Sequence, residues 1–204
     1  HQGLIQRSKS AWCFPVIVVR EPRKKPRVCV DYRLLNEVTK TDAYVLPRQD
    51  DTLDALGGSR IFSTLDLARR FHQQVVDPES RPKTAFATRR GLWEWTRLPF
   101  GVKNGPASFQ RLMQFVLQDL CWKCCLLYLD DIIVYSKSFD DHLVHLQDVF
   151  DALRKAGLRV RSEKCHFGAH SISYLGHVIS PEGIRVDPEK VKSVQDFARP
   201  KTYR

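Results

Sequence analysis

Hydrophobic and polar positions alternate with a period of two in several short stretches of this chain. In "RIFSTLDL" the alternation predicts a strand that places Ser63 on one face and Asp66 on the other. Further short strands are predicted at "KTAFAT" and "GLWEWTRL", and "VCVDYRLLN" is predicted to be a short β-rich stretch. A hairpin that turns at "PEG" is predicted within "SISYLGHVISPEGIRV".

Other stretches have the helical period. "LPRQDDTLDALGG" predicts a short helix that ends at Gly57, and "FGVKNGPASFQRLMQFVLQDL" predicts a loop that leads into a longer helix. "FDDHLVHLQDVFDALRKAG" predicts an amphipathic helix, on which His142 and His145 are expected at the surface because no third metal ligand is in view. Its expected buried stripe is Leu143, Leu146, Phe150 and Leu153. A last helix is predicted to begin in "DPEKVKSVQDF".

These elements do not alternate strictly as β, α, β, so the pattern predicts an α+β fold with an antiparallel sheet. The 204 residues, 43% of them hydrophobic, suffice for one large domain or two small ones with a sizeable core. No signal peptide or membrane-spanning run is visible, so we expect an intracellular protein that does not bind a membrane. Its six cysteines are expected to be reduced thiols.

The formal charge of +10 suits an acidic partner such as nucleic acid, although a basic surface also serves solubility. Basic residues cluster in "REPRKKPR", residues 20–27. This cluster is either a solvated loop or a loop that contacts phosphate, and the charge alone does not decide between them.

The adjacent acids Asp130 and Asp131 interrupt an apolar run, "CLLYLDDIIVYSK". A β-hairpin with both carboxylates at its turn would present them together, and a bound cation would relieve their repulsion. Oxygen ligands suit Mg²⁺, and Asp66 is the best candidate for a third carboxylate. The alternative is an ordinary hairpin turn with solvated acids.

Several blocks together resemble one family. "VCVDYRLLNEVT", "FSTLDLARRFHQ", "RPKTAFAT", "LPFGVKNGPASFQRLM", "YLDDIIVYS", "GLRVRSEKCHF" and "YLGHVIS" occur in the order found in reverse transcriptases. The chain most resembles the reverse transcriptase in the Pol polyprotein of gypsy-like LTR retrotransposons, over roughly residues 10 to 200.

The resemblance implies the fingers and palm of a right-hand polymerase, with an antiparallel palm sheet packed on helices. Residues 1–60 would be mainly fingers, and residues 61–204 mainly palm, with part of the fingers and the primer-grip hairpin. The thumb, connection and RNase H would be absent. The implied activity is RNA-directed DNA polymerisation with two Mg²⁺ ions, for which Mn²⁺ could substitute.

The implied partners are an RNA or DNA template with its primer, deoxynucleoside triphosphates, and downstream RNase H and integrase domains of the parent polyprotein. The implied location is a cytoplasmic particle, the nucleus or both.

The resemblance also assigns site residues. The catalytic set would be Asp66, Asp130, Asp131 and Lys164, and the metal ligands would be the three aspartates with the carbonyl of Leu67. Nucleotide-binding residues would be Arg27, Lys25 (or Lys24), Arg69, Arg70, Phe71 and Phe100, of which Phe71 would exclude ribonucleotides. Nucleic-acid-binding residues would be Gly101, Asn104, Tyr128, Leu129, Tyr174, Leu175 and Gly176.

One segment departs from the family pattern. Before Phe71 the family usually carries a small residue and a glycine, whereas this chain has Arg69 and Arg70. Glycine allows the closest approach of backbone amides to a triphosphate, so Arg70 either contacts phosphate or obstructs it. This leaves open an alternative function, a catalytically impaired or repurposed nucleic-acid-binding remnant, and a second one, a structural or interaction protein.

Overall fold

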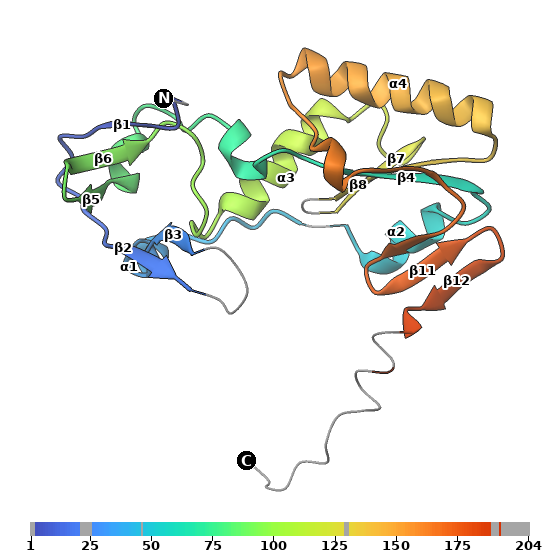
Figure 1. The fold of residues 1–204 in the computed structure, drawn as a ribbon, viewed down its shortest axis with the longest axis horizontal. Coiled ribbons are helices and arrows are strands. Elements are labelled where there is room, and N and C mark those ends of the chain that lie inside the picture. Colours follow the sequence, from blue (N-terminus) through green and yellow to red (C-terminus); the bar gives the residue numbers. More distant parts are fainter. Residues whose placement is uncertain (1–2, 21–25, 46, 129–130, 189–191, 193–204) are drawn as a thin grey trace, which may run out of the picture. The chain divides into compact units, whose positions relative to one another are not determined.

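The computed structural model describes residues 3–20, 26–45, 47–128, 131–188 and 192. The chain divides into two compact units (Figure 1). Unit 1 comprises His1–Leu46 and Leu67–Val116, and unit 2 comprises Pro47–Asp66 and Leu117–Arg204. Both units combine helices with antiparallel sheets, which confirms the predicted α+β class. Among the described residues, no helix is long and apolar enough to cross a bilayer.

Unit 1 contains two small sheets. Strands β1 (Ile5–Arg7), β6 (Gly91–Trp95) and β5 (Phe86–Thr88) form one antiparallel sheet, and β2 (Val16–Val19) pairs with β3 (Arg27–Val30) in the other. Its helices are α1 (Arg33–Val38), α3 (Gly105–Val116) and the 3₁₀ helices η1 (Arg70–Gln73) and η2 (Arg81–Thr84). The second half of "VCVDYRLLN" is therefore helical, because β3 ends at Val30 and α1 follows.

Unit 2 is built on a four-stranded sheet in the order β7 (Cys125–Tyr128), β8 (Asp131–Ser136), β4 (Ile61–Asp66) and β9 (His166–Ala169). Every adjacent pair is antiparallel. A second sheet contains β10 (Ile172–Tyr174), β11 (His177–Ser180) and β12 (Gly183–Val186). Helices α2 (Gln49–Ala55) and α4 (Phe139–Lys155) and the 3₁₀ helix η3 (Ser162–Lys164) complete the unit.

The two faces of the β4–β8 pair have different neighbours, because alternate side chains point to opposite faces. Phe62 and Tyr135 are paired and belong to a buried cluster with residues of α2, β10 and β11. Ser63 lies on the other face, where its hydroxyl contacts α4. Asp66, three residues beyond Ser63, therefore shares the face of Phe62 as predicted.

The hairpin predicted at "PEG" joins β11 to β12, where Ser180 pairs with Gly183. Strand β10 extends the sheet through a tighter turn, in which Tyr174 pairs with His177. The two residues between them, Leu175 (φ 49°) and Gly176 (φ 81°), both have positive φ, as a type I′ hairpin turn requires. The helix predicted in "DPEKVKSVQDF" falls largely outside the described residues.

Helix α4 begins at the predicted segment, where the Ser138 hydroxyl accepts a hydrogen bond from the Asp141 amide. Its buried face was predicted correctly at Leu153, which is 2% exposed, but incorrectly near the start of the helix. His142 is 1% exposed, whereas Leu143 is 52% exposed. His142 is buried because hydroxyls on two strands bond both of its ring nitrogens, which offsets the cost of removing an imidazole from water.

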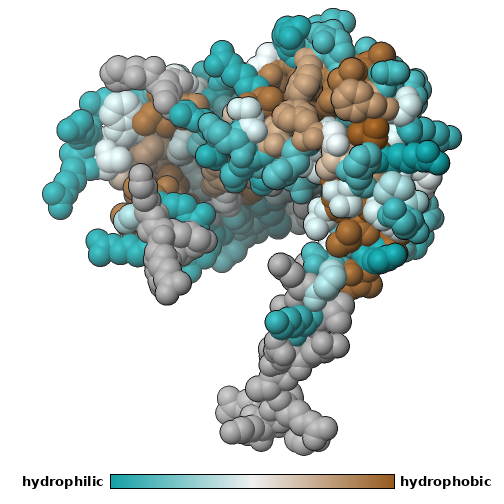
Figure 2. Space-filling view, turned by 45° about the vertical axis from the view of Figure 1, so that its right-hand side comes forward, coloured by the Kyte–Doolittle hydropathy of each residue, from teal (hydrophilic) through white to brown (hydrophobic). Residues whose placement is uncertain are grey.

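Hydrophobic side chains also reach the surface of unit 2. Phe139 on α4 and Phe167 on β9 are 56% and 51% exposed, and Phe167 packs against Phe150 with ring centroids 6.3 Å apart. Figure 2 shows hydrophobic surface among hydrophilic residues in the part of the molecule that contains α4. All six cysteines are free thiols, as predicted.

Candidate active site

The acidic centre of unit 2 lies where β4 ends and β8 begins. Asp66 is the last residue of β4 and pairs directly with Asp131, the first residue of β8. Directly opposed side chains on an antiparallel pair share a face, with Cβ atoms about 4.5–5.5 Å apart. The fold therefore brings together two of the three predicted carboxylates across 65 residues of sequence.

The position of Asp131 corrects one detail of the predicted hairpin. Asp131 is not in the turn but in the strand, where it pairs with Tyr128 on β7 as well as with Asp66. Only Leu129 and Asp130 separate Tyr128 from Asp131, and both lie outside the described residues. A strand position suits Asp131, because its backbone is then fixed by its neighbours on both sides.

Two tyrosines predicted to contact nucleic acid lie near Asp131. Burial, followed by the charges of Asp131 and Tyr128, raises the pKa of Tyr174. The Tyr174 hydroxyl is buried and has no hydrogen-bond partner within the described part of the chain. The Tyr128 hydroxyl accepts a hydrogen bond from Gln49 Nε2 at 3.2 Å. The hairpin that contains Tyr174, Leu175 and Gly176 therefore belongs to the surroundings of the acid pair.

The predicted Lys164 lies on η3, which packs against β4. The amide of Arg161 donates to the backbone carbonyl of Asp66 at 2.7 Å, and the amide of Lys164 donates to the carbonyl of Arg161 at 2.9 Å. Two hydrogen bonds thus join Lys164 to the residue that bears the first carboxylate. The Lys164 side chain is exposed.

In unit 1, Phe71 is the centre of an aromatic cluster. Its ring centroid lies 5.1 Å from that of Phe100 and 5.4 Å from that of Phe109 on α3. Phe100 is 51% exposed, so one side of the cluster is open to solvent. The carbonyl of Leu67, predicted to contact a metal, accepts a long hydrogen bond (3.4 Å) from the Arg70 amide.

The two arginines that depart from the family pattern have unusual backbone conformations. Arg69 has φ 55° and Arg70 has φ 34°. Residues with a Cβ rarely adopt positive φ, and each costs about 1–2 kcal/mol there. The expectation that glycine suits this turn is consistent with these angles. Burial, and secondly the charge of Arg69, lowers the pKa of the neighbouring His72.

A cavity of about 540 Å³ in unit 1 is lined by Arg27 and Phe100 from the predicted nucleotide-binding set. Its wall also contains His72 and Trp95, whose rings stack with centroids 5.1 Å apart. The sequence prediction missed both, because nothing in the local pattern of a histidine or tryptophan indicates which cavity it will line. Lys24 and Lys25 lie outside the described residues.

Asn104 and Gly101 organise the loop before α3. The Asn104 side-chain amide donates to the carbonyl of Lys40 at 2.8 Å, and its oxygen accepts from the Asp42 amide at 3.1 Å. The carbonyl of Gly101 accepts from Asn36 at 2.8 Å. Asn104 therefore holds this loop against the segment after α1, and Gly101 holds it against α1 itself. A contact of either residue with nucleic acid stays a prediction.

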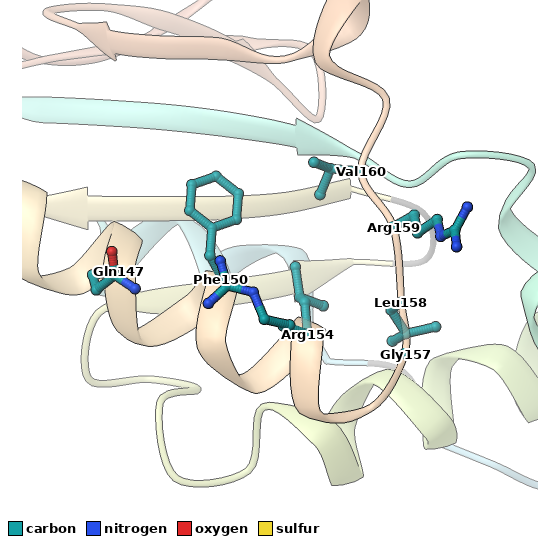
Figure 3. A pocket seen from close by; sticks show the side chains of 8 residues that line it. Gln147, Phe150, Arg154, Gly157, Leu158, Arg159 and Val160 are labelled. Carbon is teal, nitrogen blue, oxygen red and sulfur yellow. The ribbon is translucent and has the colours of Figure 1, made fainter.

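Unit 2 has a further cavity of about 620 Å³ between α4 and the segment that follows it. Figure 3 shows Phe150, Leu158 and Val160 around this space. Its charged lining residues are Arg154 and Arg159. No residue of the predicted site lines this cavity.

The family resemblance implies divalent ions, which prefer oxygen ligands such as carboxylates. No cluster of three or more His, Cys, Asp or Glu side chains suited to a metal occurs among the residues described, a set that excludes Asp130. The Asp66–Asp131 pair nevertheless fits a hard cation, because it offers oxygen ligands only. Opposed like charges on a strand pair are destabilising, and a divalent cation between them would reverse that effect.

The sequence matches the family described as "Reverse transcriptase (RNA-dependent DNA polymerase)" over residues 19–179. It is 44% identical to the retrovirus-related Pol polyprotein from transposon 297 of Drosophila melanogaster, covering 98% of this chain and 19% of the relative. It is 38% identical to that from transposon gypsy of the same species, covering 97% and 20%. The chain thus spans about one fifth of the length of these relatives.

The fold is similar to that of the foamy viral protease–reverse transcriptase. The structure solved with double-stranded DNA gives a TM-score of 0.85 at 28% identity, covering 98% of this chain and 41% of that chain. The structure solved with an RNA/DNA hybrid gives 0.83 at 27% identity, covering 97% and 26%. The expected polymerase fold is therefore confirmed, while the assignment of residue ranges to fingers and palm stays a prediction. The chain belongs to the reverse transcriptase family of nucleotidyltransferases, and within it resembles the Pol sequences of gypsy-like retrotransposons.

Proposed function

We propose that this chain forms the polymerase centre of an RNA-directed DNA polymerase that adds deoxynucleotides to a primer 3′-hydroxyl. The observation that carries the proposal is the direct pairing of Asp66 with Asp131 at the ends of two buried strands. An acid pair on rigid strands, in a chain of this family, has a clear use as a cation site. The alternative, an ordinary hairpin turn with solvated acids, gives no reason for Asp66 to pair with Asp131.

In the proposed mechanism, Asp66, Asp130 and Asp131 would hold two Mg²⁺ ions. The Leu67 carbonyl would be a further ligand, and Mn²⁺ could substitute. The ions, when bound, stabilise the attacking and leaving oxygens of an in-line phosphoryl transfer. The role of the three carboxylates would be to set the positions of these ions relative to the primer and the nucleotide. Lys164, an exposed residue whose backbone is joined to that of Asp66 by two hydrogen bonds, would donate a proton to the pyrophosphate as it leaves.

The residues of unit 1 are assigned to the incoming nucleotide. Arg27, with Lys25, Arg69 and Arg70, supplies positive charge for the triphosphate. Phe71 and Phe100 form an apolar surface against the sugar, and the Phe71 ring fills the space that a ribose 2′-hydroxyl would need. The packing of Phe71 against Phe100 and Phe109 supports this role, because a rigid ring discriminates by shape better than a mobile one.

The charge distribution supports a primer–template as the partner. Unit 1 has 18 Lys and Arg against 7 Asp and Glu, a formal charge of +11, whereas unit 2 has 15 against 16. Phosphate contacts from the basic unit would supply most of the binding free energy. The foamy viral relatives solved with double-stranded DNA and with an RNA/DNA hybrid support both kinds of duplex as ligands. We also propose that RNase H and integrase domains lie downstream in the parent polyprotein.

The second candidate function is a nucleic-acid-binding remnant without catalysis. The observation that favours it is the positive φ of Arg69 and Arg70, where bulky side chains occupy a turn that suits glycine. Primer extension on an RNA template with Mg²⁺ distinguishes the two. If the chain is a polymerase, extension should be lost in Asp131→Asn and retained in the matched variant Asp140→Asn, which changes an exposed aspartate at the start of α4. Binding without extension, even after Arg70→Gly, would support the remnant.

A further inference from the structure

A chain of hydrogen bonds crosses the core of unit 2 on the face opposite the acid pair. His142 Nε2 lies 2.7 Å from the Ser63 hydroxyl on β4, and His142 Nδ1 lies 2.9 Å from the Ser136 hydroxyl on β8. The Ser136 hydroxyl lies 2.8 Å from His145 Nδ1. Ser63, Ser136 and His142 are each at most 3% exposed. The His142 imidazole therefore links α4 by hydrogen bonds to β4 and to β8, the strands that carry Asp66 and Asp131.

The strand that follows Lys164 takes part in the same network of hydrogen bonds. The amide of Gly168 on β9 donates to the Ser63 hydroxyl at 3.0 Å. Strand β9 follows η3, which contains Lys164 and is bonded to Asp66 through the Arg161 amide. The strands that carry Asp66 and Asp131, and the strand that follows Lys164, are thus all connected to His142 through two serine hydroxyls.

The hydrogen positions follow from counting donors and acceptors. Because Ser63 already accepts from Gly168, its hydroxyl proton is best used by donating to His142 Nε2. His142 then carries its proton on Nδ1 and donates to Ser136, whose hydroxyl donates to His145 Nδ1. In this arrangement the hydroxyls of Ser63 and Ser136 and both ring nitrogens of His142 have hydrogen-bond partners while the His142 imidazole is neutral. A buried polar network in which each group is paired favours one arrangement of the elements it joins.

We propose that His142 is a positioning residue for the polymerase centre, holding β4, β8 and β9 in the alignment that sets Asp66, Asp131 and Lys164 relative to one another. This inference rests on the proposed function. It assigns a role to a buried histidine that touches neither nucleotide nor metal. Hydrogen bonds orient metal-binding groups from outside the first layer of ligands, and their loss typically weakens metal binding about 10- to 100-fold.

A merely structural role for His142 predicts a different outcome, which a matched variant can separate. Val149 lies on the same helix, is fully buried and makes no side-chain hydrogen bond. Val149→Ala leaves a cavity under α4 and lowers stability without touching the network. His142→Leu keeps the volume of the side chain but removes both hydrogen bonds. Ser63→Ala removes one of them with a smaller change and serves if His142→Leu does not fold.

The experiment uses the polymerase that contains this chain, bound to primer–template, well below its melting temperature. Calorimetric titration with Mn²⁺ gives the metal affinity, and steady-state primer extension gives the Mg²⁺ midpoint, kcat and the nucleotide KM. The proposal predicts that His142→Leu and Ser63→Ala weaken Mn²⁺ binding about tenfold, raise the Mg²⁺ midpoint and lower kcat, with the nucleotide KM unchanged. Val149→Ala is predicted to leave the metal affinity unchanged.

Equal metal affinity in His142→Leu, Ser63→Ala and the wild type would overturn the positioning role. So would a loss in Val149→Ala as large as that in His142→Leu, because the effect would then follow stability alone. If the wild-type complex itself bound no Mn²⁺ and extended no primer, the proposed function would fail instead. The two failures are therefore distinguishable.

Discussion

Arg69→Gly is predicted to stabilise this chain. Arg69 has φ 55° and ψ 12°, the left-handed region in which a residue with a Cβ costs about 1–2 kcal/mol. Glycine removes that cost but gains about 0.5–1 kcal/mol of conformational entropy in the unfolded chain. The net expectation is an increase of about 0–1.5 kcal/mol in the free energy of unfolding, with a central value of about 0.75 kcal/mol. For a chain of this length, the central value corresponds to about 1.5–3 °C in melting temperature.

The assay is thermal unfolding of wild type, Arg69→Gly and Arg69→Ala under identical conditions. Alanine removes the guanidinium and its charge but retains the Cβ, so it keeps the backbone strain. Only the glycine variant is predicted to melt higher. An equal rise in Arg69→Ala would mean that the charge, and not the backbone, destabilises the turn. No rise in either variant would refute the strain argument.

Four further outcomes follow from the site and its surroundings. Arg69→Ala should raise the pKa of His72, measured by NMR titration, because burial and then the Arg69 charge lower it; an unchanged pKa would contradict that contact. Burial, and secondly the charge of His145, lowers the pKa of His142, so the unfolded chain binds protons more readily than the folded one. The free energy of unfolding should therefore fall as the pH drops below about 6.5. His142→Leu should make this dependence on pH shallower, and an equal slope in the variant would contradict the contribution of His142. Phe71→Ala should raise ribonucleotide incorporation relative to deoxyribonucleotide about 10- to 200-fold, and unchanged discrimination would remove the proposed role of the ring. Primer–template affinity should fall about 10³-fold between 50 and 200 mM salt if unit 1 contacts six or more phosphates, and salt-insensitive binding would favour a structural or interaction protein.

Local patterns sufficed for much of the fold. The period of two in "RIFSTLDL" predicts β4 and the face that Asp66 shares with Phe62, because pleating alone fixes that alternation. Helix α4 follows from its apolar repeat. The end of that helix is also local, since Gly157 has φ 69° and few residues other than glycine adopt that conformation.

The parts that could not be predicted depend on contacts between distant residues. His142 was expected at the surface because no third metal ligand was in view, yet its partner Ser63 lies 79 residues earlier in the chain and is not visible in any local window. The pairing of Asp66 with Asp131 likewise depends on the sheet. The residue pattern made Asp66 only the best candidate for a third carboxylate, and the family resemblance then assigned it to the catalytic set. Asp131 was expected in a turn because aspartate favours turns, but pairing on both sides overrides that propensity.

The most direct test of the proposed polymerase is single-nucleotide addition to a primer annealed to RNA, with Mg²⁺, by wild type and by Asp66→Asn. Binding of the primer–template is measured in parallel. The predicted result is a fall in the addition rate on the order of 10⁴-fold with little change in binding, because the variant removes a ligand for the ions and not a contact to the duplex. Addition by Asp66→Asn at the wild-type rate would contradict the assignment of the acid pair as the catalytic centre.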